Sequence, residues 1–521
     1  MIIPIIYEDD HFIVADKPAG IATHAGAPGQ IAFVEQLSEQ TGHKLGVHQR
    51  LDAATSGVIA FSKTQQGAQK LQKAFELRNV KKTYRALVCG IPDAPSGQWV
   101  HYLAHKDGLT IEADSGKLSK SRYRIIKSFG PFTLLELDLL TGMTHQLRVQ
   151  CALAGYPILG DTLYGGGDLF PRLCLHAHKL RLLSEPNLPT FQAPLPEILD
   201  RPSLNKIVRP ILTAAMAQYA PIPDTEAIRL LTPQHSGIPE LIIEKLAQIL
   251  LIRHLEPDTQ SLWTTSSLNE FIETVRRSFG CSQFCYRVHE SPATKHPCRA
   301  FTKAFAQTPD PFTATENDIR FGFDLSGNAT GLYLDQRSNR AWIREHARGN
   351  VLNLFAYTCA FSVCAAKSPA VTATTSIDAA SAALRRGRSN FELNDISLDG
   401  HRFITEDVFK YLNRCIQNHT QFDTVICDPP SFGRFEKITF SLDESLEKLI
   451  EACLQVAAPN AVLLFSINHR KIRLNRLKSA WKQALQKTNK SAKSVDIFIN
   501  DDATGPLGVG TDLKTIRAEI I

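Results

Sequence analysis

Apolar and polar residues follow two different patterns in the front and back of this 521-residue chain. Toward the front, short apolar runs such as 123–126 and 134–137 alternate with turn-forming residues, and a helical pattern covers 65–77. Short strands broken by turns, with few helices, are typical of a mixed-sheet α+β fold. We predict such a fold for residues 1–215.

Strand and helix patterns alternate regularly toward the back. Strands are expected at 351–354, in the run ending at 378, near 403 and at 424–427, with helices at 360–366, at 379–390 and near 409. This alternation implies right-handed βαβ units and a Rossmann-like, doubly wound parallel sheet for 311–521. The chain is therefore predicted to be multidomain, with an α+β and an α/β part.

Two proline-rich stretches separate these regions. The first runs from Pro186 to Pro223, and its proline spacing predicts few secondary elements there. The second runs from Ser291 to Pro311. Between domains at 1–215 and 311–521 they leave a small accessory domain at 216–310.

The composition excludes several protein classes. Hydrophobic residues make up 43% and charged residues 21%, so neither global disorder nor a fibrous protein is expected. The net charge of +6 suits a polyanionic partner without requiring one. No signal peptide, membrane anchor or long apolar run is recognisable, so no membrane partner is expected.

The number and spacing of the cysteines indicate the compartment of the protein and whether it holds a metal. Eleven scattered cysteines favour reduced thiols in a cytoplasmic protein over a disulfide framework. Cys281 and Cys285 have no matching second pair, so we expect no metal site.

The most informative front string is H-Q-R-L-D-A-A-T-S-G at 48–57, which places Asp52 among turn-forming residues. Taken alone, Asp52 could be a nucleophile, a general base or a turn cap. Two further strings give it context: K-K-T-Y-R-A at 81–86 and T-G-M-T-H-Q-L-R-V at 141–149.

With the opening D-K-P-A-G at 16–20, these strings resemble the RluA-type RNA pseudouridine synthases over about residues 3–196. The resemblance implies that Asp52 is the catalytic aspartate and that Tyr84 stacks on the target base and helps to remove its proton. It also implies that Arg148 pairs with Asp52, and that Arg50 fills the gap left in the RNA by the flipped uridine.

Pseudouridine formation breaks the carbon–nitrogen glycosidic bond and re-forms it at carbon 5, which needs a nucleophile and a proton acceptor but no cofactor. Attack of Asp52 on the sugar and its action as a base that yields a glycal both remain open. The chain departs from the family at Gln49, where His is usual before Arg, and at Met143, which replaces Arg. Altered RNA contacts are expected from Met143, and His145 is expected to be a satisfied, strand-packing histidine.

In the back region, Asp378 ends the second strand, where a cofactor ribose needs an acceptor. The D-P-P-S-F string at 428–432 directly follows a predicted strand, and its prolines rigidify a loop that can receive a base edge. A nicotinamide dehydrogenase would also explain Asp378, but the chain lacks the G-x-G-x-x-G loop after Leu354.

With T-G-L-Y-L-D-Q-R at 330–337 and N-L-F-A-Y-T at 353–358, the back resembles class I SAM-dependent methyltransferases of large-subunit ribosomal RNA over 312–468. The string at 237–245 resembles the small domain that precedes the catalytic domain in that family. The resemblance implies S-adenosyl-L-methionine (SAM) as cofactor, held by Asn353, Phe355, Tyr357, Thr358, Asp378 and Asp407. It also implies that Asp428 is catalytic and that the acceptor base meets Pro429, Pro430, Ser431 and Phe432.

Two functional hypotheses follow. The first is a bifunctional RNA-modifying enzyme, acting on ribosomal rather than transfer RNA. The second makes the back domain a non-catalytic RNA-binding module, because Cys359 replaces a family glycine where a Cβ could crowd the cofactor. The segment 464–470 lacks the cysteine needed for methylation at cytosine carbon 5 and is closer to guanine-modifying relatives.

Overall fold

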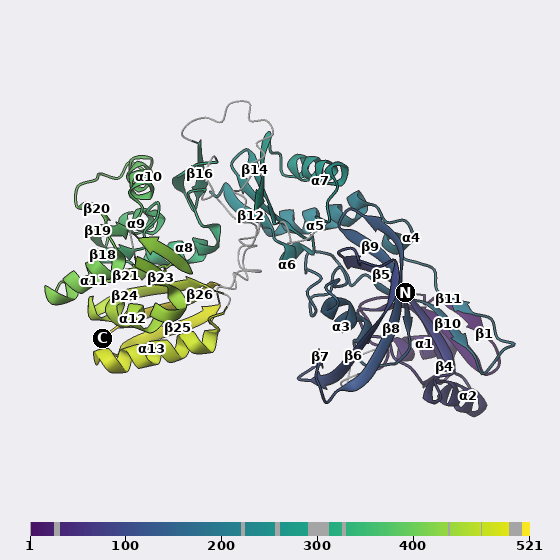
Figure 1. Ribbon diagram of the computed structural model, residues 1–521. Helices are drawn as coiled ribbons and strands as arrows, with labels where there is room; N and C mark the ends of the chain where they lie inside the picture. The colour runs from purple at the N-terminus through teal and green to yellow at the C-terminus, as the bar shows by residue number, and fades with distance from the viewer. Residues whose placement is uncertain are drawn as a thin grey trace.

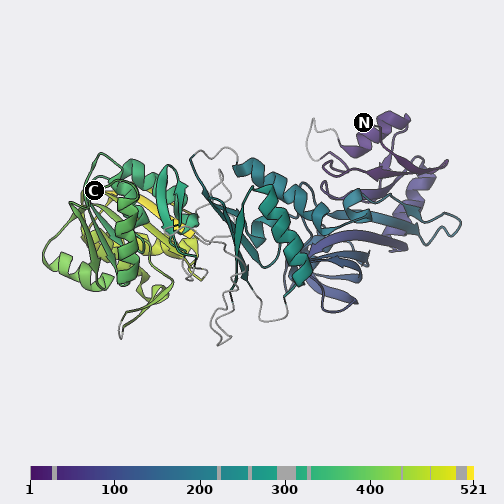
Figure 2. The ribbon, with the colours of Figure 1, turned by 90° about the horizontal axis from the view of Figure 1, so that it is seen from above.

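The computed structural model describes residues 2–25, 32–219, 224–255, 261–289, 312–325, 330–435, 438–469, 471–499 and 513–521. We call the described residues up to 219 the front part, 224–289 the middle part, and those from 312 the back part. Both ribbon views place the middle part between the other two (Figures 1 and 2).

The described front part forms one mixed eleven-stranded sheet. Its main order is β1 (Ile5–Glu8), β2 (Phe12–Lys17), β4 (Ser56–Ser62), β10 (Leu175–Leu182), β5 (Val80–Cys89), β9 (Phe132–Leu139), β8 (Lys117–Phe129), β6 (Ser96–Lys106) and β7 (Leu109–Glu112). Two short strands lie off this path: β3 (Gly46–Val47) pairs with β4, and β11 (Phe191–Gln192) with β10. Only β4 and β10 pair in parallel among these described strands, which confirms the predicted mixed sheet.

The helices of the front part are α1 (Phe33–Thr41), α2 (Gln65–Glu76), α3 (Gln146–Leu153), α4 (Glu197–Asp200) and α5 (Leu204–Tyr219). Helix α2 was predicted, whereas α5 contradicts the expectation of few elements in the proline series. Pro210 lies inside α5, where proline costs about 3 kcal/mol by removing an N–H and crowding the preceding turn. The helix forms because it buries an apolar stripe in the core: Ile207, Val208, Ile211, Leu212 and Ala215.

The middle part is a four-stranded sheet in the order β12 (Ala227–Leu231), β13 (Leu241–Leu246), β14 (Ile249–Leu255) and β15 (Gln283–His289), with α6 (Pro233–Ser236) and α7 (Thr265–Ser278). Its two faces pack differently because side chains alternate along a strand. Leu250 and Ile252 belong to the core of the front part. Ile249 and Leu251 belong to a core shared with the back part.

The described back part has a seven-stranded sheet in the order β20 (His401–Thr405), β19 (Val371–Asp378), β18 (Gly349–Leu354), β21 (Phe422–Cys427), β24 (Ala457–Asn468), β26 (Leu513–Ile520) and β25 (Ala492–Ile499). The first five are parallel, as predicted, and β26 runs antiparallel to both neighbours. Two hairpins complete the strands: β16 (Phe312–Glu316) with β17 (Ile319–Phe323), and β22 (Phe432–Phe435) with β23 (Ile438–Ser441).

Helices cover both faces of this sheet, so it is doubly wound (Figure 1). The helices are α8 (Arg337–His346), which follows a short 3-10 turn at Leu334–Gln336, α9 (Ala360–Ala366), α10 (Ser381–Glu392), α11 (Val408–Gln417), α12 (Leu442–Gln455) and α13 (Leu474–Thr488). Leu352 and Leu354 of β18 face α11, α12 and α13, while Val351 faces α8 and α9. None of the described helices has the length and apolarity needed to cross a bilayer.

Candidate active sites

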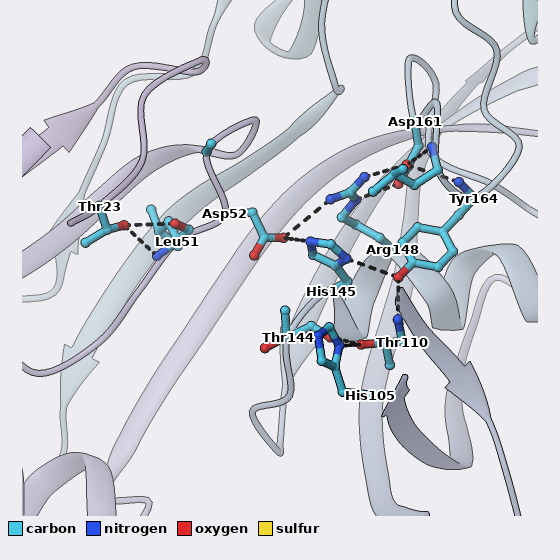
Figure 3. A network of polar contacts seen from close by, with 12 residues as sticks. Thr23, Leu51, Asp52, His105, Thr110, Thr144, His145, Arg148, Asp161 and Tyr164 are labelled. Carbon is cyan, nitrogen blue, oxygen red and sulfur yellow. Dashed lines mark hydrogen bonds and ion pairs between the residues drawn. The ribbon is translucent and has the colours of Figure 1, made fainter. Parts of the chain in front are cut away.

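Asp52 lies in the loop between β3 and β4. Side chains of neighbouring segments hold this loop by hydrogen bonds to its backbone. The Thr23 hydroxyl donates to the Leu51 carbonyl at 2.8 Å and accepts from the Leu51 N–H at 3.0 Å (Figure 3). Lys17, at the end of β2, is fully buried and donates to the Ala53 carbonyl at 3.1 Å. The loop therefore presents Asp52 from a rigid support.

Gly57 follows the loop and allows β4 to approach β10 closely. Its φ of 119° favours glycine, and a Cβ there would overlap the Ala177 carbonyl of β10. The parallel approach of β4 to β10 thus requires a glycine five residues after Asp52.

Arg148 of α3 is the positive group that faces Asp52. Its Nη1 lies 3.8 Å from Oδ2 of Asp52, as the predicted pairing requires. Its tighter partner is Asp161, whose carboxylate accepts from Nε at 2.8 Å and from Nη2 at 2.7 Å. This bidentate pair fixes the guanidinium plane, so Asp161 orients Arg148 (Figure 3).

The sequence motifs described above do not include Asp161 or its neighbour Tyr164. The signal that identifies them is the G-D-x-x-Y-G string at 160–165.

His145 lies at the N-cap of α3 with φ of 57°, so its expected place in a strand was wrong. Its Nε2 is 3.9 Å from Oδ2 of Asp52, and its Nδ1 is 3.1 Å from the Tyr164 hydroxyl (Figure 3). Burial lowers the pKa of His145, and the Asp52 charge only partly opposes this shift. The lowered pKa favours the neutral form of the imidazole that lies beside the Asp52 carboxylate.

The other predicted front residues fall around this centre. Tyr84, on β5, is 8% exposed, and burial together with the charge of Asp52 raises the pKa of its phenol. Arg50 is exposed two residues before Asp52. Met143 stands in the turn before α3, where its sulfur accepts a hydrogen bond from Ser119 at 3.3 Å.

The back part holds a cavity of about 460 Å³ at the carboxyl ends of its parallel strands. It brings together most residues that the sequence singled out: Phe355, Tyr357, Thr358, Asp378, Asp407, Asp428, Pro429, Pro430 and Ser431. Asn353 is not among the lining residues. It is buried in β18 and donates to the Ser362 hydroxyl at 2.8 Å. Phe432 begins β22, and its side chain lies outside the described part.

The loop between β18 and α9 curls around one end of the cavity. Phe355, Tyr357 and Cys359 all have positive φ, of 57°, 47° and 58°, which is rare for residues with side chains. The fold offsets this strain by fixing the loop to Asp378, whose carboxylate accepts from the Tyr357 N–H at 2.7 Å and the Ala380 N–H at 2.8 Å. Burial nevertheless raises the pKa of Asp378.

Cys359 does not line the cavity, so the expected crowding of the cofactor was wrong. Its buried sulfur fills the space over Gly387 of α10, where an added Cβ would overlap it. The Cys359 side chain is therefore accommodated between the β18–α9 loop and α10, away from the cavity lining.

Asp428 lies at the end of β21, between the cavity and the core. Its Oδ1 accepts from Gln336 Nε2 at 2.7 Å and from the Ser466 hydroxyl at 2.8 Å. Burial and the charge of Asp335 raise the pKa of Asp428 to about 7, against the effect of both hydrogen bonds. The next loop is held by Ser431, which donates to the Asn468 carbonyl at 2.7 Å.

Two aspartates lie in the cavity where SAM would need hydrogen-bond acceptors. Asp378 ends the second strand of the predicted order, and Asp407 caps α11 after the third, accepting from the Lys410 N–H at 2.9 Å. These two acids line the cavity together with the apolar side chains of Phe355 and Leu332. Ribose hydroxyls and an adenine amine are donors that suit carboxylates at these positions.

Two family models match the chain. The model described as RNA pseudouridylate synthase matches residues 11–153, and the one described as S-adenosylmethionine-dependent methyltransferase matches residues 242–498. An uncharacterized RNA pseudouridine synthase of Chlorobaculum parvum is 32% identical in an alignment of 255 residues that covers 41% of this chain and 77% of the relative. A putative ribosomal RNA large subunit methyltransferase, YwbD of Bacillus subtilis, is 35% identical over 211 residues, 40% of this chain and 51% of the relative.

Other proteins are also matched over only part of their length. The chain spans 65% of the ribosomal large subunit pseudouridine synthase D of Nitrosomonas europaea, with 32% identity over 39% of this chain. Among solved structures, a methyltransferase complexed with SAH, SMU.776, covers 61% of this chain at 23% identity, with 80% of its own chain matched and a TM-score of 0.50. That likeness supports the fold of the middle and back parts. This chain belongs to the RNA pseudouridine synthase family through its front part, and the same chain carries a SAM-dependent methyltransferase domain at its back.

Proposed function

We propose that the protein is a bifunctional enzyme that converts uridine to pseudouridine at Asp52 and methylates a base of the same class of RNA in the back cavity. The observation that carries the proposal is the composition of that cavity. It joins five of the six predicted cofactor residues, all but Asn353, to Asp428 and the proline loop, and Cys359 does not line it. A non-catalytic delivery module has no need for such a site.

In the front site, the target uridine must leave its stack to reach Asp52. Tyr84 supplies the buried aromatic face beside the carboxylate, and Arg148 orients the carboxylate through the ion pair. Exposed Arg50 stands where a side chain can occupy the gap in the RNA. Because the charge of Asp52 raises the pKa of Tyr84, consuming that charge by bonding to the substrate makes the phenol easier to ionise.

In the back site, SAM supplies a methyl group on a sulfonium. Asp378 and Asp407 bind and orient the cofactor, so that positioning supplies much of the catalysis. Asp428 accepts a hydrogen bond from the acceptor amine. Both of its protein donors bond Oδ1, so among the described contacts Oδ2 remains for the substrate.

The acceptor proposed here is the exocyclic amine of guanine. Methylation at cytosine carbon 5 needs a thiolate, and Cys427, the cysteine next to Asp428, is fully buried with a raised pKa. An amine needs only an acceptor and alignment, which Asp428 and the proline loop provide.

Ribosomal RNA in the cytoplasm is the proposed substrate. Relatives of both halves carry ribosomal large subunit RNA in their names, and both proposed reactions act on flipped bases. The ten described cysteines are free thiols, which suits a reducing compartment.

The test is to incubate the full chain with unmodified large-subunit RNA and isotopically labelled SAM, and to count both products by nucleoside mass spectrometry. Asp52→Asn should abolish pseudouridine and leave the methyl label unchanged, and Asp428→Asn should do the reverse. Pseudouridine without methyl label, together with no SAM binding in calorimetry, would establish the delivery module instead.

A further inference from the structure

The middle part contacts the loop that supports the front site. This loop, residues 160–168, carries Asp161, which holds Arg148, and Tyr164, which contacts His145 (Figure 3). The loop is closed on itself: the Gly160 N–H donates to the Gly166 carbonyl at 2.9 Å, and the Gly166 N–H donates to the Asp161 carbonyl at 2.8 Å. Displacement at Gly166 or Gly167 is therefore passed to Asp161.

The contact is made by the turn at 235–237, which ends α6. The His235 carbonyl accepts from the Asp168 N–H at 2.9 Å, and Nδ1 of His235 lies 2.6 Å from Oδ1 of Asp168. His235 is itself held from α5, where Gln218 lies 3.0 Å from its Nε2. The turn is thus fixed on both sides.

The two backbones touch at glycines. A Cβ on Gly167 would overlap the Gly237 nitrogen, and a Cβ on Gly237 would lie 2.5 Å from the Gly166 carbonyl oxygen. Only glycines allow this approach, which is closer than side-chain packing permits. Neighbouring Leu169 shares a core with Ile238 of the middle part.

We propose that the 235–237 turn is a positioning element of the pseudouridine synthase site, holding the 160–168 loop so that Asp161 orients Arg148 toward Asp52. The proposal rests on the proposed function of the front site. It assigns to the middle part, most of which the methyltransferase model covers, a second task in the other reaction. The path runs from His235 to Asp168, along the loop to Asp161, and through Arg148 to Asp52.

Two glycines in the same loop provide a matched test. Gly167 has φ of 82° and meets the turn, whereas Gly165 has φ of 91° and a Cβ added to it would meet nothing within 4 Å. Alanine at either site carries the same kind of backbone cost, but only Gly167→Ala pushes against Gly237. Both variants are made in the full chain.

We expect Gly167→Ala to lower the single-turnover rate of pseudouridine formation by about tenfold to a hundredfold, with little change in the KM for RNA. Its methyl transfer should match that of Gly165→Ala, which should keep most of the pseudouridine rate. Equal rates in the two variants, or a joint loss of both activities and of RNA binding in Gly167→Ala, would overturn the positioning role.

Hydrogen exchange tests the same path without an activity. Gly167→Ala should raise amide exchange at 160–168 and in α3, and Gly165→Ala should not. Unchanged exchange in both variants contradicts the proposal. If the wild-type chain makes no pseudouridine but the two variants still differ in exchange, the proposed function is refuted. The contact between the turn and the loop would then still control the loop's position.

Discussion

Asp428 changes protonation state near neutral pH because burial and the nearby charge of Asp335 disfavour its carboxylate, which raises its pKa to about 7. Below that pH the group is a neutral acid, and above it a carboxylate that can accept from an amine. The methyl-transfer rate should therefore rise with pH through about 7. The free energy of unfolding depends on pH in the opposite direction. Between pH 3.8 and about 7, Asp428 keeps its proton in the folded state but has lost it in the unfolded chain. Rising pH therefore lowers the free energy of unfolding in this range.

The measurement is the rate of methyl transfer at saturating RNA and SAM across this range. Asp335→Asn removes the repelling charge and should move the midpoint to lower pH. Ser466→Ala removes a donor and should move it to higher pH. A midpoint that responds to neither change would assign the titration to another group.

The sequence predicts the side chains that we propose for the chemistry better than it predicts the residues that hold them in place. Asp52, Tyr84 and Arg148 stand in strings that resemble those of the pseudouridine synthases, and the structure places Arg148 3.8 Å from Asp52. Asp161 was not predicted, because a carboxylate in a glycine-rich turn has a structural explanation until its partner is seen. The family resemblance implies that Asn353 holds the cofactor, but strand alternation turns its side chain into the core.

The loop from β18 to α9 and the helix α10 form one unit through Cys359 and Gly387. Alanine normally stabilises a helix relative to glycine by about 1 kcal/mol. At Gly387 the added Cβ would meet the Cys359 sulfur, so Gly387→Ala should instead destabilise the back part and weaken SAM binding, since the loop lines the cavity. Adding Cys359→Gly removes the sulfur and relieves a positive φ of 58°.

We predict that Cys359→Gly compensates for the loss caused by Gly387→Ala. Gly387→Ala should raise the Kd for SAM in calorimetry and lower the melting temperature, and the Cys359→Gly, Gly387→Ala double variant should recover both. Contacting residues give such non-additive effects, whereas independent sites add. Simple additivity of the two changes would show that the sulfur does not pack on Gly387.

Element types were predictable where periodicity is strong, and failed where burial overrides a local preference. The strands and helices from 349 to 427 follow the predicted alternation. Helix α5 was missed because local rules treat Pro210 as a helix breaker. Its apolar spacing at 207, 208, 211 and 212 is the signal that outweighs the proline. The second proline-rich stretch, 291–311, lies outside the described residues.

At the scale of the whole molecule, the middle sheet joins the two halves through its opposite faces. Leu250 belongs to the core of the front part. Leu251, the next residue of β14, belongs to the core that includes the hairpin β16–β17 and Ala356 and Cys359 of the loop between β18 and α9. The 235–237 turn, which contacts the 160–168 loop, lies between β12 and β13 of the same sheet. Strand alternation therefore lets one sheet support both sites at once.

Adjacent substitutions should separate these two supports. Leu250→Ala and Leu251→Ala each remove a fully buried side chain, at a cost of about 2–5 kcal/mol. Leu250→Ala should raise hydrogen exchange in α5 and the 160–168 loop and slow pseudouridine formation. Leu251→Ala should raise exchange in β16, β17 and α10 and weaken SAM binding. If both variants loosen the same half, the two faces do not act as separate supports, and the halves instead unfold as one unit.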